Sequence, residues 1–151
     1  MPPTTPGLTS TRVTRRISAE PTSTALLLAG PTAVDLWPDV HRVGDSAGRV
    51  AVEAELDGVA LAATVRARPP KRTPTSYVTQ FEFEGSDVPF TEGRLTLTYG
   101  PGSSGPATWA VLTLERDASR PGAVDGARLE RMAHQFLDNL ARAAEERSRA
   151  A

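Results

Sequence analysis

Two histidines, His41 and His134, are the only residues of the type that exchanges protons readily at neutral pH. They lie far apart in the sequence, and neither belongs to an HExxH or similar metal-binding spacing. The chain has no cysteine, which excludes disulfides, thiolate metal sites and a cysteine nucleophile. We therefore expect no metal site and no cofactor.

Other patterns that carry chemistry are also missing. The sequence contains no GxGxxG or GxxxxGK[ST] loop for phosphate and no GxSxG nucleophile elbow. Four glutamates alternate with apolar residues along two predicted strands, at positions 53, 55, 82 and 84, which is typical of a solvated sheet face rather than of a glycosidase acid pair. The familiar enzyme classes are therefore absent, and catalysis is left open.

Charge and hydropathy exclude two kinds of partner. Lys and Arg number 17 against 18 for Asp and Glu, so the net charge of −1 gives no general attraction to nucleic acid. No apolar run approaches the ~18 residues of a membrane span, and the first residues lack the order of a signal peptide. We expect a cytoplasmic monomer or homodimer with no nucleic-acid partner and no membrane insertion.

The 151 residues predict one domain preceded by a tail. Residues 1–10 are rich in Pro, Thr, Gly and Ser and predict a disordered tail, which leaves residues 11–151 as the domain. Residues 11–18 predict an edge strand with Val13 and Ile17 on its inner face. Pro21 and the Gly30-Pro31 and Pro38 breaks predict two short helices, up to residue 29 and over residues 32–37.

From residue 41 the apolar period changes to two, which predicts strands. Residues 49–56 and 59–68 alternate on either side of Asp57-Gly58, a strong hairpin signal, and residues 69–74 predict a loop. Strands are also predicted at 76–84, 94–99 and 108–115, with both phases of the last one left open. The inward faces predicted for these strands carry Val50, Val52, Ala54, Leu56, Leu61, Ala63, Val65, Ala67, Tyr77, Thr79, Phe81, Phe83, Leu95, Leu97 and Tyr99.

Residues 124–150 predict one long helix with Asp125 as its N-cap. On its polar face Asp138 and Arg142 have the favourable i,i+4 order of acid before base. Because a long helix with one apolar face needs a partner, we expect it to pack on the inward faces of the strands. Its apolar stripe consists of Leu129, Met132, Ala133, Phe136, Leu137, Leu140, Ala143 and Ala144.

The order of these elements resembles the SRPBCC or START-like helix-grip superfamily, which includes polyketide cyclases and lipid-transfer domains. Local residues fit the resemblance: the Leu36-Trp37-Pro38 junction before a strand, the strand beginning at Gly48-Arg49, and the Asp57-Gly58 hairpin. The resemblance covers residues 12–147 and implies an α+β fold. It implies a curved antiparallel sheet of about seven strands around the long C-terminal helix, with two short helices after the first strand.

The resemblance further implies a hydrophobic cavity between the sheet and the C-terminal helix. A carrier of a polyketide, isoprenoid or lipid-like metabolite is then the leading hypothesis, with Tyr77 and Tyr99 offering hydroxyls and the tryptophans at the entrance. A cyclase or dehydratase that folds a reactive chain, and an interaction protein with a filled cavity, are the alternatives. The candidate lining residues are Trp37, Leu61, Val65, Tyr77, Thr79, Phe81, Phe83, Leu97, Tyr99, Trp109, Met132, Phe136 and Leu140.

Overall fold

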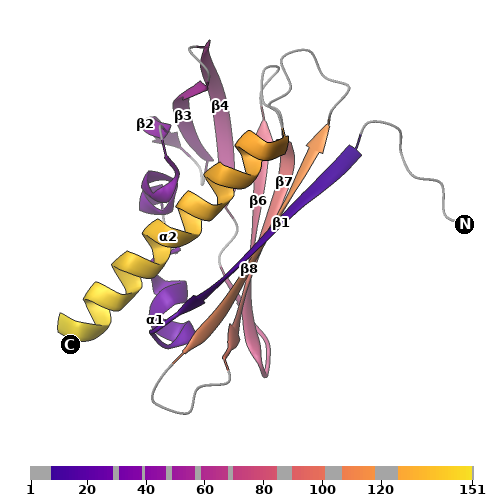
Figure 1. Cartoon of the computed structure of the whole chain (residues 1–151). Helices are drawn as coiled ribbons and strands as arrows, with labels where there is room; N and C mark the ends of the chain where they lie inside the picture. The colour runs from indigo at the N-terminus through magenta and orange to yellow at the C-terminus, as the bar shows by residue number, and fades with distance from the viewer. Residues whose placement is uncertain are drawn as a thin grey trace, which may run out of the picture.

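A computed structural model describes residues 8–28, 31–38, 40–46, 49–56, 59–67, 70–84, 90–100, 107–117 and 126–150. It combines one large antiparallel sheet with a long C-terminal helix (Figure 1). The elements in chain order are β1 (Leu8–Ile17), α1 (Pro21–Leu26), the 3₁₀ helix η1 (Pro31–Leu36), β2 (Val40–Ser46), β3 (Arg49–Leu56), β4 (Val59–Ala67), β5 (Lys71–Arg72), β6 (Ser76–Glu84), β7 (Phe90–Tyr99), β8 (Thr108–Asp117) and α2 (Gly126–Ala150).

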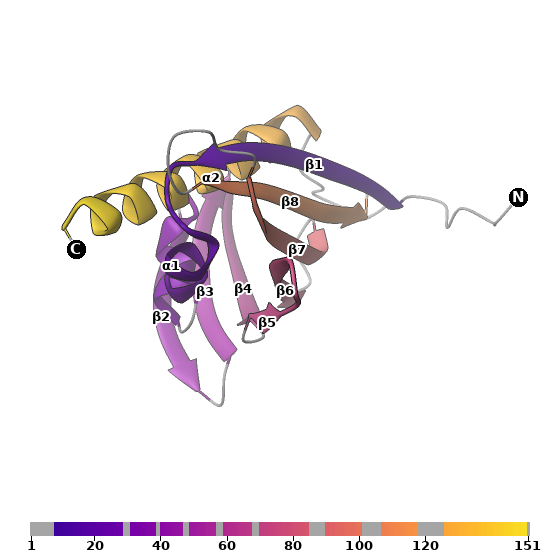
Figure 2. The ribbon, with the colours of Figure 1, turned by 90° about the horizontal axis from the view of Figure 1, so that it is seen from below.

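The strand order explains why the two short helices are needed. The sheet runs β1-β8-β7-β6-β4-β3-β2, with β5 paired to β6 off this path, so β1 and β2 follow one another in sequence but lie at opposite edges. The segment with α1 and η1 carries the chain from one edge to the other. Figure 2 shows the sheet curving around this segment and α2. The helix-grip architecture predicted from the sequence is therefore confirmed.

Several element boundaries differ from the sequence predictions. β1 begins at Leu8 and pairs with β8 from its first residue, so residues 8–10 belong to the sheet and not to the predicted tail. Residues 71–72 form β5 within the predicted loop, because they pair with Val78 and Tyr77 of β6. β3 and β4 pair up to Leu56 and Val59, as a two-residue hairpin requires, whereas Asp57, Gly58 and the predicted N-cap Asp125 lie outside the described residues.

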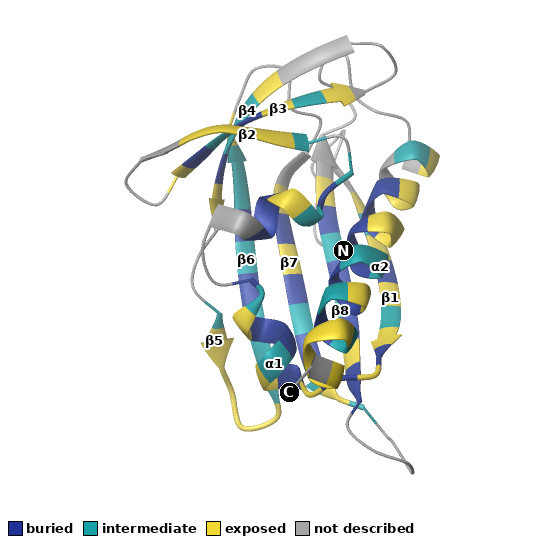
Figure 3. Ribbon diagram, turned by 90° about the vertical axis from the view of Figure 1, so that its left-hand side faces the viewer, coloured by how far each residue is buried: buried dark blue, intermediate teal, exposed yellow. Residues whose placement is uncertain are grey.

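The core lies between the concave face of the sheet and the apolar stripe of α2. The helix has 25 residues, about 37 Å of length, and its stripe is buried while the opposite face is exposed (Figure 3). The side chain of Leu129 lies outside the described residues, and the rest of the stripe agrees with the prediction except that Ala141 is fully buried and Ala143 only half-buried. The fully buried members are Ala133, Phe136, Leu137, Leu140, Ala141 and Ala144.

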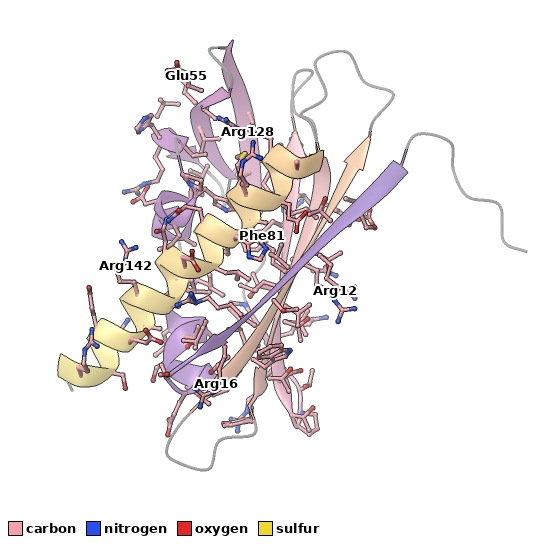
Figure 4. All side chains as sticks on the ribbon, in the orientation of Figure 1. Arg12, Arg16, Glu55, Phe81, Arg128 and Arg142 are labelled. Carbon is pink, nitrogen blue, oxygen red and sulfur yellow. The ribbon has the colours of Figure 1, made fainter. Side chains whose placement is uncertain are left out.

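Polar contacts fix the C-terminal half of α2 to the β1 edge. Arg15 shares the face of Val13 and Ile17 and donates from Nη1 to Oδ1 of Asp138 at 2.6 Å. The structure thus pairs Asp138 with β1, in place of the predicted partner Arg142, which points away from the sheet (Figure 4). About two helical turns further on, the backbone N–H of Ser18 donates to Glu145 at 2.9 Å. These contacts make the helix position depend on the edge strand.

Gly93 allows the sheet and its core to approach closely. Its position in β7 faces inward, opposite Phe81 and Leu114, and a Cβ there would lie 2.9 Å from Leu114 Cδ2 and 3.5 Å from Phe83. Gly44 in β2 differs, because a Cβ there would meet nothing within 4 Å. The two glycines therefore form a matched pair of a crowded and an open site.

We predict that Gly93→Val lowers the free energy of unfolding by about 1–3 kcal/mol, because the added methyl groups overpack a buried layer. Gly44→Val is the control and should stay within about 0.5 kcal/mol. Urea unfolding monitored by circular dichroism measures both. Equal losses at the two sites would show that space around Gly93 is not the cause.

Phe136→Ala should cost about 3–5 kcal/mol of unfolding free energy, since the ring is fully buried. Leu26→Ala on α1 is the control: it also truncates an apolar helical side chain, but one that is 56% exposed, and its cost should be below about 1 kcal/mol. Chemical denaturation of both variants measures the difference. A loss below about 1 kcal/mol for Phe136→Ala would contradict the central role given to α2.

Candidate functional site

An aromatic cluster joins α2, the sheet and the segment after η1. Phe136 stacks on Trp37 with ring centroids 4.4 Å apart and 25° between the planes. Phe81 meets Phe136 edge-on at 6.4 Å, and Phe83 meets Trp37 edge-on at 6.5 Å. Figure 4 shows Phe81 between the sheet and α2. Protein rings therefore fill this part of the space that the sequence analysis assigned to a ligand.

Most of the candidate lining residues lie on the concave side, where the alternation placed them. Tyr77 and Phe83 are half-buried, and Leu61 belongs to β4 with its side chain outside the described residues. That the set lines a ligand cavity stays a prediction. The buried members are Trp37, Val65, Thr79, Phe81, Leu97, Met132, Phe136 and Leu140.

Three aromatic candidates differ from the expectation. Tyr99 follows Leu97 on the inward face, but it is the last residue of β7 and is 58% exposed. The structure also settles the phase of β8, in which Ala110, Leu112 and Leu114 face inward, so Trp109 faces outward and is 42% exposed. We therefore remove Trp109 from the candidate lining residues.

The third aromatic candidate, Tyr77, does face inward, but its hydroxyl already has a protein partner. The hydroxyl lies 2.9 Å from the Thr22 hydroxyl of α1, and either oxygen can be the donor. Tyr77 therefore fastens α1 to β6. This contact weakens the earlier expectation that its hydroxyl is offered to a ligand.

The concave face continues past the aromatic cluster onto β2, β3 and β4. There Val34 of η1 packs with Val50, Val52 and Val65 in a second, smaller buried cluster. Between the two clusters, and in contact with both, lie Val40, Ala63 and Phe83, which are only half-buried. This strip of inward apolar surface is covered less completely than its neighbours on either side.

A surface groove of about 820 Å³ opens at the Val40 end of this strip. Its walls come from η1, from the residues that lead into β2, from β2 itself and from one residue of α2. Trp37 and Val40 belong both to the groove and to the apolar core region, so the groove borders the aromatic cluster. The lining residues are Asp35, Trp37, Pro38, Val40, His41, Arg42, Gly44 and Asn139.

The polar residues of the groove are held by local contacts. Nε of Arg42 donates to Oδ1 of Asp35 at 2.9 Å, which joins β2 to η1. Asn139 donates from Nδ2 to the Leu36 carbonyl at 2.8 Å and accepts from Gln135 at 2.9 Å. Asn139 therefore fixes α2 to η1, while Arg42 and His41 remain as side chains that can meet a ligand.

Sequence reasoning identified Trp37 in this groove but missed Asp35, Arg42 and Asn139. A signal for the contact between Asp35 and Arg42 was available in the sequence, because these opposite charges lie on either side of the Trp37-Pro38 break. The two histidines are not brought together: His41 lines the groove, whereas His134 lies on the polar face of α2 with Nε2 3.8 Å from Glu130.

The rest of the described chain offers less for a ligand. A second hollow of about 220 Å³ on the outer face is lined mainly by polar side chains, including Gln80, Arg94 and Thr113. Among the described residues, no group of three or more His, Cys, Asp or Glu could hold a metal ion. No helix in the described part is long and apolar enough to cross a membrane. The groove at η1 and β2 is therefore the candidate site.

Comparisons with known proteins report on the fold. No protein-family model and no curated protein matches the sequence. Among solved structures, the Zhui aromatase/cyclase from Streptomyces sp. R1128 has a TM-score of 0.67 at 17% identity, covering 95% of this chain and 97% of that one. TTHA0849 from Thermus thermophilus has a TM-score of 0.62 at 17% identity, with coverages of 93% and 99%.

A START superfamily protein from Mycobacterium smegmatis also matches, with a TM-score of 0.52 and 16% identity over 91% of this chain and 95% of that one. Such identities establish architecture only. The sheet order, the α1–η1 crossing and the gripped C-terminal helix agree with these similarities. The chain therefore has the SRPBCC or START-like helix-grip fold.

Proposed function

We propose that this protein binds a hydrophobic small molecule in the groove between η1, β2 and α2. The observation that carries the proposal is the strip of half-buried apolar residues, Val40, Ala63 and Phe83, on the concave face next to Trp37. When an apolar ligand removes partly exposed apolar surface from water, the free energy of the system falls, which favours binding. A polyketide, isoprenoid or lipid-like metabolite has the required chemistry.

The size and composition of the groove support this proposal. Its volume of about 820 Å³ lies within the ~300–1,000 Å³ typical of small-molecule sites. Its lining combines the apolar side chains of Trp37, Pro38 and Val40 with polar ones, so it offers contacts to an apolar body and to a polar end group. The similarity in fold to an aromatase/cyclase and a START superfamily protein is in keeping with such a ligand.

An enzyme of the cyclase or dehydratase kind is the second candidate. The observation that favours it is His41, which lines the groove and is a residue type suited to proton transfer at neutral pH. The third alternative is an interaction protein with a filled interior. The packed rings of Trp37, Phe81 and Phe136 are the observation that favours it. Binding at the groove distinguishes the first two functions from the third.

The two tryptophans allow a direct binding test, because Trp37 borders the groove and Trp109 lies on the outer face. We expect 12-bromododecanoate, whose bromine quenches indole emission on contact, to quench the Trp109→Phe protein in a saturable manner. The Trp37→Phe protein, which retains only the outer indole, should show little quenching. Unbrominated dodecanoate in excess should restore the emission.

Binding should also stabilise the fold by about 2.7 kcal/mol when the free ligand reaches 100 times its dissociation constant. A thermal melt of the unaltered protein detects this shift and serves as a control for both variants. Absence of quenching together with an unchanged melting temperature would overturn the proposal and leave the interaction protein.

A separate variant distinguishes carrier from enzyme. His41→Gln should leave the affinity for dodecanoate within about twofold. If His41 transfers protons, the same change should lower turnover of a linear poly-β-keto thioester by about 100-fold or more. Product formation followed by mass spectrometry measures this rate. Turnover that is equal in both proteins would exclude His41 as the proton-transfer group, and no turnover in either would favour the carrier.

A further inference from the structure

The contacts that Arg42 makes with the described residues leave some of its N–H donors unused. Its Nε donates to Asp35 at 2.9 Å, and the part of the chain that the structure describes supplies no other hydrogen bond or ion pair to this side chain. A guanidinium carries five N–H donors, so its two terminal NH₂ groups stay available. One N–H of each group points to the end of the guanidinium opposite Nε, where a carboxylate can accept two parallel hydrogen bonds.

Asp35 fixes the position of this fork. Arg42 and Asp35 come from β2 and η1, and both side chains are only partly exposed, at 38% and 49%. A guanidinium tethered through Nε loses less rotational freedom when it binds an anion than a free arginine does. Asp35 is therefore a positioning residue, and its own charge limits how strongly the arginine attracts an anion.

The register of β2 sets Arg42 beside the apolar wall. Val40 pairs with Ala54 and Arg42 pairs with Val52, so the two residues share the inward face of β2. Residues two apart on a strand are separated by about 6.6 Å. The pairing register shifts between Arg42 and Gly44, which ends the regular face just beyond the arginine. An apolar body against Val40 and Trp37 would thus place its end group near Arg42.

The other groups at the groove do not compete for that role. Both the oxygen of the Asn139 amide and one of its N–H groups are already used within the protein. His41 is adjacent in sequence and pairs with Glu53, on the opposite face of the strand from Arg42. Arg42 is accordingly the group best placed to receive a charged end of the ligand.

We infer that the ligand is an amphipathic monoanion, a carboxylate or an enolate on an apolar body, and that Arg42 binds its anionic end. This inference rests on the proposed binding at the groove and adds the ligand's charge. A neutral hydrocarbon or ester of the same length binds more weakly, because it leaves the arginine donors without a partner.

The test compares 12-bromododecanoate with its methyl ester, using quenching of Trp37 in the Trp109→Phe protein. We expect the acid to bind about tenfold more tightly than the ester, in line with one charge-assisted contact at a partly exposed site. Arg42→Met should abolish this preference and leave the affinity for the ester within about twofold of that of the starting protein. Asp35→Asn should act in the opposite direction and raise the affinity for the acid severalfold, because it keeps an acceptor for Nε and removes a competing charge.

The two variants are expected to change the affinity for the acid in opposite directions, although they remove the two partners of one ion pair. A purely structural role of this ion pair would instead lower the affinity for both acid and ester in both variants. Arg49→Met is the matched control, because Arg49 is paired with Glu84 at 3.5 Å outside the groove, and its change should leave the preference intact. Equal binding of acid and ester by the starting protein overturns this inference but not the proposed function. Binding of neither overturns both.

Discussion

The contact on which the rest of the structure depends is the stack of Phe136 on Trp37. Phe136 belongs to α2, Trp37 follows η1, and Phe81 of β6 closes the cluster from the sheet. A fully buried aromatic ring removes a large apolar area from water, so this one position fastens the helix, the crossing segment and the sheet together. The polar contacts of α2 with Arg15, Ser18 and the Leu36 carbonyl lie around this apolar centre.

The curvature of the sheet creates the space that this cluster only partly fills. α2 packs on the β1 side of the sheet, where Arg15 and Ser18 fasten its C-terminal half. The absence of a side chain at Gly93 lets Leu114 and Phe83 pack closely at the centre. On the other side, β2, β3 and β4 turn away, with Val34 of η1 covering part of their inward face. The half-buried residue Val40 on this side lines the groove.

The groove is also a consequence of β2 being an edge strand. An unpaired edge exposes backbone donors and acceptors that invite pairing with other chains, and proteins protect such edges with charges and irregularities. β2 has both, since Arg42 is joined to Asp35 and the register shifts before Gly44. Val43 within this irregular stretch is 57% exposed. The same features that protect the edge supply the polar rim of the proposed ligand site.

Apart from the short strand β5 within a predicted loop, the sequence alone determined the order of helices and strands and most inward faces, because apolar periods of 3.6 and 2 report which side of a helix or strand is buried. It determined that Phe136, Phe81 and Leu97 are core residues. Tertiary structure decided what a period cannot encode, namely which neighbours surround a given side chain. The alternation predicts the inward face of Tyr99 but not its exposure, the pairing of β8 decides which face Trp109 occupies, and the packing of η1 beside β2 brings Asp35 to Arg42.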